Sequence, residues 1–248
     1  KIPVVAEKEP GKLPWKQYKV DVVIESTGRF TNMEAAKRHI TAGAKRVVIS
    51  APAKEVPTYL MGVNHASMPA SLEVINNASC TTNSIAPVIA IMHEKFGVKK
   101  AMMSTVHSVT AEQNLVDSVP PALHPDLRRA RSAVVNIVPT TTGAAKATTE
   151  AIPELKNLFD GIALRVPTIN VSLSDFTMVL RKATTAEEIN SIFKAAAKTP
   201  RWKGILGVTD EPLVSRSARD LGVDRRRSRA GQCPLQRLVH LHDAPRSD

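Results

Sequence analysis

The chain has little cysteine and few aromatic residues. It contains 2 cysteines among 248 residues, and Phe, Trp and Tyr together make up 4% of the sequence. Two cysteines cannot by themselves form a disulfide framework or a cysteine-rich zinc site, so we expect a reducing, cytoplasmic setting and no metal. No apolar run approaches the roughly 18 residues of a membrane-spanning helix, and residues 1–11 lack the apolar core of a secretory signal. We therefore expect no membrane partner.

The positive charge is distributed unevenly along the chain. The formal net charge is +11, and residues 216–248 hold eight arginines, four aspartates and no lysine. The composition thus changes near residue 215, and we interpret residues 216–248 as an atypical tail that is frame-shifted or disordered. A basic RNA-binding module is one alternative for the whole chain. The low aromatic content argues against stacking on bases, so no nucleic-acid partner is expected.

The first part of the chain is typical of an α/β fold. A β-branched run at 20–26 predicts a buried strand, Thr31 begins a capping box for a helix that ends at Gly43, and residues 46–50 predict a second strand. A strand, a helix and a strand in this order indicate a parallel sheet. Ligands of such sheets bind at the carboxyl ends of the strands.

Two residues that could carry chemistry follow the next predicted strand, at 72–75. Cys80 lies on a polar turn before a helix that runs to about residue 95, and a strand at 101–106 presents His107 at its end. The helix N-terminus stabilises a thiolate, and a histidine nearby would complete a thiolate–imidazolium pair. A small buried cysteine and an uninvolved histidine are the alternatives.

The second half mixes strands and helices. The expected elements are a long loop at 113–139, a helix opening at 140–143, strands at 162–166 and 169–180, and a helix capped by Thr185 with Glu188.

Several polar residues could bind phosphate. Hydroxyl groups and the N–H groups of helix starts are phosphate ligands, and the candidates are Ser79, Thr81, Thr110, Thr142 and Gly143. Arg165 lies in an apolar strand and needs an anion, which is either a structural carboxylate or a substrate phosphate. A Cys–His pair also fits a cysteine protease, but a protease explains neither the parallel sheet nor Arg165.

At this point the motifs match a known family. Over about residues 3–215 the chain resembles phosphorylating glyceraldehyde-3-phosphate dehydrogenase, through Asn-Ala-Ser-Cys-Thr-Thr-Asn at 77–83, Thr-Val-His at 105–107, Thr-Gly-Ala-Ala-Lys-Ala at 142–147 and Leu-Arg-Val-Pro-Thr at 164–168. The resemblance implies the C-terminal part of a Rossmann-type dinucleotide-binding domain at 1–79 and an α+β catalytic domain at 80–215. The related erythrose-4-phosphate dehydrogenase is an alternative that the motif at 142–146 disfavours.

The resemblance also implies a mechanism. Cys80 would attack the aldehyde of glyceraldehyde 3-phosphate, His107 would accept the proton, and inorganic phosphate would cleave the resulting thioester. Arg165 would serve both phosphate sites, with Thr110 at the substrate phosphate and Ser79, Thr81, Thr142 and Gly143 at the attacking phosphate. NAD, or alternatively NADP, would lie against Thr27, Gly28, Phe30 and Ser50. A homotetramer is implied for the full-length protein.

Three departures from the family pattern lead us to expect an incomplete chain with weak cofactor affinity. The first strand and the glycine-rich turn are missing upstream, residues 118–122 resemble an insertion, and the usual ending is absent. Arginines in the long loop could contact an NADP phosphate, although intersubunit salt bridges are favoured. We interpret Cys233, His240 and His242 as unselected tail residues, with a metal site at the two histidines as a disfavoured alternative.

Overall fold

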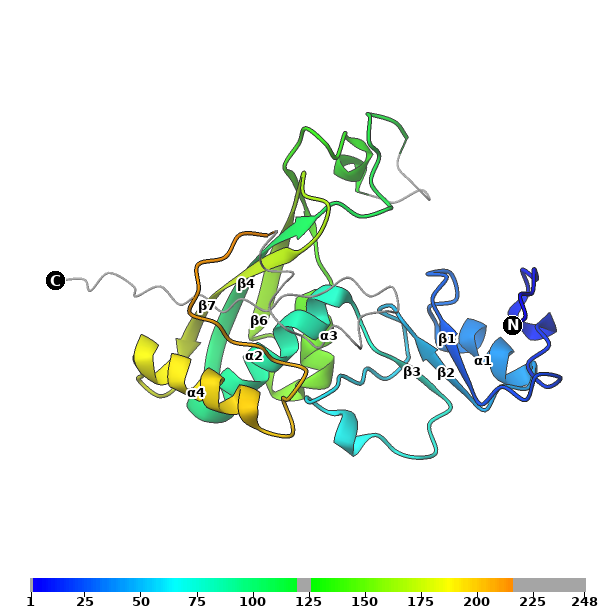
Figure 1. Cartoon of the computed structure of the whole chain (residues 1–248), viewed down its shortest axis with the longest axis horizontal. Coiled ribbons are helices and arrows are strands. Elements are labelled where there is room, and N and C mark those ends of the chain that lie inside the picture. Colours follow the sequence, from blue (N-terminus) through cyan, green and yellow to red (C-terminus); the bar gives the residue numbers. More distant parts are fainter. Residues whose placement is uncertain (1, 120–125, 216–248) are drawn as a thin grey trace. The chain divides into compact units, whose positions relative to one another are not determined.

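The chain divides into two compact units. The computed structural model describes residues 2–119 and 126–215, and the units are Lys1–Ser79 and Cys80–Asp248 (Figure 1). The sequence also placed a boundary between residues 79 and 80, and the assignment of residues 1–79 to a dinucleotide-binding domain and of 80–215 to a catalytic domain stays a prediction. The expectations for the tail at 216–248, and for residues 120–122 of the apparent insertion, lie outside the described residues.

The first unit contains a small parallel sheet. Strands β1 (Val22–Glu25), β2 (Arg46–Ile49) and β3 (Val74–Asn76) pair in this order, all parallel, and α1 (Met33–Thr41) connects the first two (Figure 1). The predicted strand, helix and strand are therefore confirmed. Short 3-10 helices flank them, η1 (Pro10–Lys12) and η2 (His65–Ser67).

The start of α1 differs by one residue from the prediction. Asn32, and not Thr31, is the N-cap, and its side chain accepts a hydrogen bond from the backbone N–H of Ala35 at 2.8 Å. Asparagine caps helices as well as threonine does, because its carbonyl oxygen reaches the same free N–H groups. At the other end Gly43 has φ +110°, a conformation that favours glycine.

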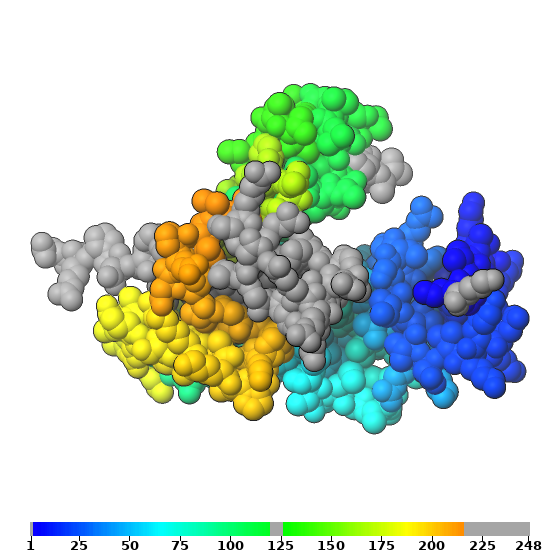
Figure 2. All heavy atoms as spheres, viewed as in Figure 1, coloured from blue at the N-terminus to red at the C-terminus, as the bar shows by residue number. Residues whose placement is uncertain are grey.

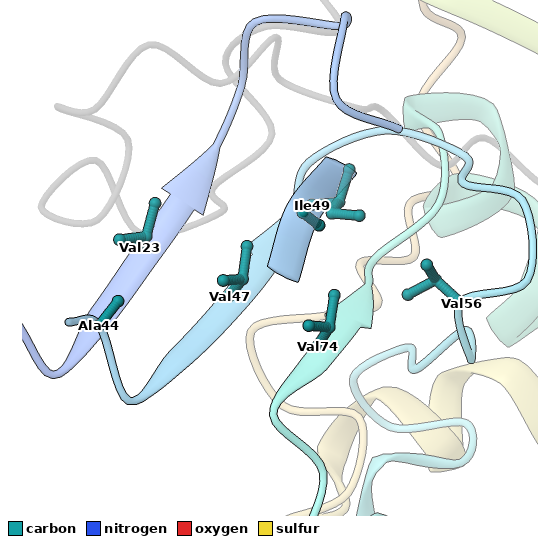
Figure 3. Packing of buried hydrophobic residues seen from close by; sticks show 7 residues of the cluster. Val23, Ala44, Val47, Ile49, Val56 and Val74 are labelled. Atoms are coloured by element: carbon teal, nitrogen blue, oxygen red, sulfur yellow. The ribbon is translucent and has the colours of Figure 1, made fainter. Parts of the chain in front are cut away.

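Alternating residues of this sheet face one apolar core. The fully buried cluster, of which Figure 3 labels six residues, consists of Val23, Ala36, Ala44, Val47, Ile49, Val56 and Val74. Each large aliphatic side chain buried in this way contributes on the order of 1.5–3 kcal/mol to folding. The core therefore fixes the register of the strands, and with it the position of the residues at their carboxyl ends.

The second unit is a mixed sheet with helices packed against it. Its strands are β4 (Val98–Ser108), β5 (Val138–Thr141), β6 (Phe159–Val166) and β7 (Ser172–Leu180). Its helices are α2 (Cys80–Phe96), α3 (Ala144–Ala151), α4 (Ala186–Lys198), η4 (Leu127–Ala130) and η5 (Pro153–Leu155). The sheet order is β5-β6-β4-β7, with β4 parallel to β6 and the other pairs antiparallel. The α/β fold class is thus confirmed.

Only one face of this sheet is well covered. Residues such as Ala101, Met103 and Ala163 point to the helices and are at most 4% exposed. On the opposite face, Met102 and Val179 are 58% and 56% exposed. The long loop forms a lobe beyond the sheet, drawn in green in Figure 2. Within the described ranges, no helix is long and apolar enough to cross a membrane.

The region after the loop also differs from the prediction. Thr140 and Thr141 belong to β5, where they pair with β6, and α3 begins only at Ala144. Threonine is β-branched and loses side-chain freedom in a helix, so a neighbouring strand edge outweighs the helix start. The loop itself contains η4, and the predicted cap of α4 by Thr185 is confirmed, with the N–H of Glu188 at 3.3 Å.

Candidate active site

Cys80 lies where the chain turns from β3 into α2. It is the first residue of α2 and is exposed to solvent. Two residues earlier, Ala78 has φ +57°, a left-handed conformation that is unusual for alanine and that reverses the chain sharply. The turn therefore presents the thiol at the N-terminus of α2.

His107 comes from β4 and faces this thiol. Its Nε2 atom lies 3.5 Å from Cys80 Sγ, which is within the range for a hydrogen bond to sulfur. Its Nδ1 atom lies 2.7 Å from the carbonyl oxygen of Ser108, an obligatory acceptor. Because that carbonyl needs a proton from Nδ1, the Nε2 lone pair is directed at the thiol. A guanidinium nitrogen of Arg165 also contacts Nδ1, but it has the Ser108 carbonyl as an alternative acceptor at 3.4 Å.

The protonation state of His107 suits a proton acceptor. Burial lowers its pKa, the hydrogen bond to the Ser108 carbonyl partly opposes this effect, and the charge of Arg165 lowers the pKa further. The imidazole is therefore neutral near pH 7 and is free to take a proton from Cys80.

Arg165 is placed by the sheet register. It lies directly opposite His107 in the β4–β6 pair, so both side chains leave the same face of the sheet. The Arg165 side chain is 14% exposed and its pKa is lowered by burial, an effect that Glu112 opposes. A buried guanidinium requires an anion nearby.

Two charged residues complete the site and were not assigned to it from the sequence. Glu112 contacts Arg129 through a very short hydrogen bond, and the same carboxylate oxygen lies 3.7 Å from Arg165. Arg129 also donates to the hydroxyl of Thr140 at 3.1 Å. The sequence shows Arg129 only as one of several arginines in the long loop. Its packing in the folded chain distinguishes it from the other arginines of that loop.

The other loop arginines pair within the chain. Arg128 binds Asp126 at 2.8 Å and Arg131 binds Asp117 at 2.9 Å. Carboxylates of the same loop therefore partner these two arginines within the chain, and the expectation of intersubunit salt bridges stays a prediction.

Several buried polar atoms at the site have no partner. Among the described residues, these atoms are Thr105 Oγ1, Thr110 Oγ1, Gln113 Nε2 and Arg165 Nε. A buried donor without an acceptor costs roughly 1–3 kcal/mol, so such atoms commonly mark a ligand site. Gln113 accepts the backbone N–H of Thr110 at 3.2 Å and thus holds that residue in place. An anion that accepts hydrogen bonds would satisfy these donors.

The remaining phosphate candidates are less closely connected to the thiol. Gly143 caps α3, and Thr142 accepts the N–H of Ala144 at 3.2 Å. Within the described residues, neither hydrogen-bonds to the Cys80–His107 pair. Ser79 and Thr81 flank Cys80 in sequence, and Thr81 is 7% exposed.

The cofactor candidates gather at the carboxyl edge of the first sheet. Gly28 follows β1 with φ +71°, and the space where a Cβ would stand is open, so a flat ligand could approach its backbone. Ser50 follows β2 and donates to Ser26 at 2.8 Å. These exposed polar strand ends fit a dinucleotide, as expected for a parallel sheet.

A buried polar network supports this edge. The Glu25 carboxylate accepts from the backbone N–H of Thr27 at 2.7 Å, from the Thr27 hydroxyl, and from His39 Nε2 at 2.9 Å. His39 in turn accepts the indole N–H of Trp15 at 3.0 Å. Burial opposes ionisation of Glu25, but the donors outweigh it and lower its pKa. Phe30 contacts His39 edge-on, with ring centroids 6.4 Å apart.

Clusters of metal-ligating side chains are absent from the described part of the chain. Residues 2–119 and 126–215 contain no group of three or more His, Cys, Asp or Glu side chains that could hold a metal ion. His240 and His242, the disfavoured metal candidates, and Cys233 lie outside these ranges.

Comparison with known families gives a consistent result. The profile of the "Glyceraldehyde 3-phosphate dehydrogenase, C-terminal domain" family matches residues 79–228. It begins next to Cys80 and extends beyond residue 215, where the resemblance was expected to end.

Similar proteins come from several bacteria and algae. Glyceraldehyde-3-phosphate dehydrogenase of Zymomonas mobilis is 50% identical over 98% of this chain and 73% of its own length. Glyceraldehyde-3-phosphate dehydrogenase 1 of Bacillus cereus is 52% identical over 86% of this chain and 63% of its own length. Chloroplastic glyceraldehyde-3-phosphate dehydrogenase A of Scenedesmus vacuolatus is 52% identical over 86% of this chain and 67% of its own length. The chain thus spans about two thirds of the length of these relatives.

Fold, site and similarity together define an oxidoreductase of the phosphorylating aldehyde dehydrogenase class. The chain belongs to the glyceraldehyde-3-phosphate dehydrogenase family. Such enzymes use a nicotinamide dinucleotide, NAD or NADP. The alternatives of an erythrose-4-phosphate dehydrogenase or an RNA-binding module gain no support from these matches.

Proposed function

We propose that this chain carries the catalytic centre for oxidation of glyceraldehyde 3-phosphate to an acyl phosphate. The observation that carries the proposal is the contact of Cys80 Sγ with His107 Nε2 at 3.5 Å, with the imidazole oriented by the Ser108 carbonyl. This arrangement suits covalent catalysis, in which a base activates a nucleophile and a third group orients the base.

His107 and Cys80 perform the steps at the aldehyde. His107 takes the thiol proton, and the sulfur then forms a bond to the aldehyde carbon, giving a hemithioacetal. The imidazolium N–H can donate to the developing alkoxide oxygen. A bound nicotinamide dinucleotide would supply the acceptor for the hydride that leaves the carbon, while His107 takes the hydroxyl proton, so that the adduct becomes a thioester. Phosphate oxygen then attacks the thioester carbon, the C–S bond breaks, and the Cys80 thiolate is released.

The arginine side of the site holds the phosphate groups. Arg165 has an unpaired, buried Nε–H, and Thr110 has an unpaired hydroxyl among the described residues. Both are directional donors for phosphate oxygens. We assign Thr110 to the substrate phosphate and Ser79, Thr81, Thr142 and Gly143 to the attacking phosphate, with Arg165 serving both.

Residues of the first unit would hold the dinucleotide. We propose NAD as the cofactor, with NADP as the alternative, bound along Thr27, Gly28, Phe30 and Ser50. The open space at Gly28 and the exposed hydroxyls at the strand ends support this assignment.

The central test compares the reactivity of Cys80 in variants of one histidine. We expect His107→Asn to slow iodoacetamide alkylation of Cys80 about tenfold at neutral pH, because no base then removes the thiol proton. Turnover of glyceraldehyde 3-phosphate, where it is measurable, should fall by roughly 10²–10⁴. A Cys80→Ser variant gives the background from Cys233.

His65→Asn is the matched control. His65 is exposed and its imidazole accepts the N–H of Gly62 at 3.0 Å, remote in sequence from Cys80 and His107, so this variant should react as the unchanged chain does. Equal alkylation rates for the two histidine variants would overturn the proposed pair.

We also propose that the chain assembles as a homotetramer, as enzymes of this family generally do. The uncovered face of the second sheet supports this, since Met102, Ile162, Leu173 and Val179 are between 45% and 58% exposed. Exposed apolar patches of this kind mark interfaces. Val179→Lys should shift the mass measured by light scattering toward smaller species, whereas Lys203→Ala should not. A monomeric unchanged chain would contradict the proposal.

A cytoplasmic location completes the proposal. The low cysteine content supports it, whereas the relative from Scenedesmus vacuolatus is named as chloroplastic. Fractionation of the source cells tests it, and recovery of the chain with an organelle would refute it.

A further inference from the structure

One carboxylate stands between the two arginines of the site. Glu112 Oε1 contacts Nη1 of Arg129 and lies 3.7 Å from Nη2 of Arg165. The Glu112 side chain is 46% exposed, whereas the two arginine side chains are only 11% and 14% exposed. An accessible anion therefore neutralises two largely buried cations.

The charge balance shows why such an anion is needed. Two guanidinium groups close together repel each other, and burial makes each positive charge more costly. In agreement, burial is the largest cause of the lowered pKa of Arg165, and the positive charge of Arg129 lowers it further. The negative charge of Glu112 opposes both effects. Without Glu112 the pair would hold two positive charges with no carboxylate between them.

The contact leaves part of Arg165 unused. Glu112 approaches Nη2 of Arg165, while Nε of the same side chain has no partner among the described residues. Thr110, two residues before Glu112, also keeps an unpaired hydroxyl. A phosphate group has three acceptor oxygens and more charge than a carboxylate, so it can satisfy donors that Glu112 leaves free.

We propose that Glu112 is an internal counter-anion that competes with phosphate for Arg165 and Arg129 and so sets the affinity of the anion site. This rests on the proposed function, because it assumes that the arginines bind phosphate. Phosphate entry displaces the Glu112 carboxylate toward solvent, where it regains water. The partial exposure of Glu112 makes this displacement possible without unfolding the loop.

Two effects of removing the charge follow. Glu112→Gln keeps the size of the side chain but removes its charge, so phosphate no longer competes with a carboxylate. We expect the dissociation constant for inorganic phosphate to fall on the order of tenfold. We also expect the phosphate-free variant to melt at a lower temperature and to recover on addition of phosphate, since a bound anion replaces the missing carboxylate.

The experiment is a titration of melting temperature with inorganic phosphate, using the whole chain, with sodium chloride at equal ionic strength as the reference. Glu94→Gln is the matched control, because the Glu94 side chain is 47% exposed, much like Glu112, and pairs at 2.8 Å with Arg201, which is 40% exposed and therefore not a buried cation. It should leave the phosphate dependence unchanged. Glu112→Asp retains the charge with a shorter reach and should give an intermediate affinity.

Each outcome decides something different. If the unchanged chain shows no phosphate-specific stabilisation, the proposed anion site is wrong. If it binds phosphate but Glu112→Gln binds no more tightly, the counter-anion role is wrong and the anion site stands. If Glu112→Gln folds only with phosphate present, the role is supported. If it does not fold in either buffer, Glu112→Asp decides, and an affinity equal to that of the unchanged chain contradicts the role.

Discussion

The buried network around His39 allows a quantitative prediction for the first unit. His39 is 3% exposed and joins the Trp15 indole to the Glu25 carboxylate through hydrogen bonds of 3.0 and 2.9 Å. His39→Ala removes both bonds, leaves the indole N–H without its acceptor and opens a cavity. Each buried polar group left unsatisfied costs about 1–3 kcal/mol, and two such groups, the indole N–H and a Glu25 carboxylate oxygen, lose their partner. We therefore expect a loss of about 3–5 kcal/mol.

Hydrogen exchange followed by mass spectrometry can localise this loss. The peptides that cover β1 and β2 should exchange roughly 100- to 3,000-fold faster in the variant, since about 1.4 kcal/mol corresponds to a factor of ten. Peptides of α4, in the other unit, should change little.

Arg38→Ala is the control on the same helix. Arg38 pairs with Glu9 at 3.6 Å, and both side chains are about half exposed, at 49% and 58%. Such a surface pair contributes about 0–1 kcal/mol, so exchange should rise only a few-fold. If His39→Ala accelerates exchange no more than Arg38→Ala does, the network does not stabilise the sheet and the reasoning fails.

Two further predictions concern the same unit. A Cβ on Gly43, whose φ is +110°, would lie 2.6–2.8 Å from atoms of Lys16, so Gly43→Ala should cost on the order of 1–3 kcal/mol in chemical denaturation. Gly207→Ala, with open space around it, should be neutral, and equal effects would contradict the steric argument. The lowered pKa of Glu25 adds stability above its ordinary value of 4.5 that is lost as the pH falls through the folded value. Exchange protection of β1, corrected for intrinsic rates, should thus fall in acid, and a Glu25→Gln variant should lack this dependence.

The sequence predicted most elements of the fold because their patterns are local. The β-branched run before Thr27 and the capping box at Thr185 depend on near neighbours, and the structure has both elements where they were expected. Thr140 and Thr141 were wrongly placed at a helix start. Their strand conformation depends on pairing with β6, some twenty residues away in sequence, and no local pattern shows such pairing.

The candidate site was predictable where a motif carried it. Cys80 and His107 were identified together, and the structure places them in contact. Glu112 and Arg129 were missed as members of the site, because their roles depend on how the long loop folds back toward β6. For Arg165 the sequence left two partners open, a structural carboxylate or a substrate phosphate. The structure shows the Glu112 carboxylate beside it.

The boundary between residues 79 and 80 also bears on how such a protein can change over generations. Cys80 is the first residue of the second unit, and His107 and Arg165 come from the same unit. Thr27 and Gly28 belong to the first. On the proposed assignment, mutations at the strand ends of one unit would alter dinucleotide binding while the thiol chemistry of the other is inherited intact. Cofactor binding and bond-making would then be separate heritable traits within a single polypeptide.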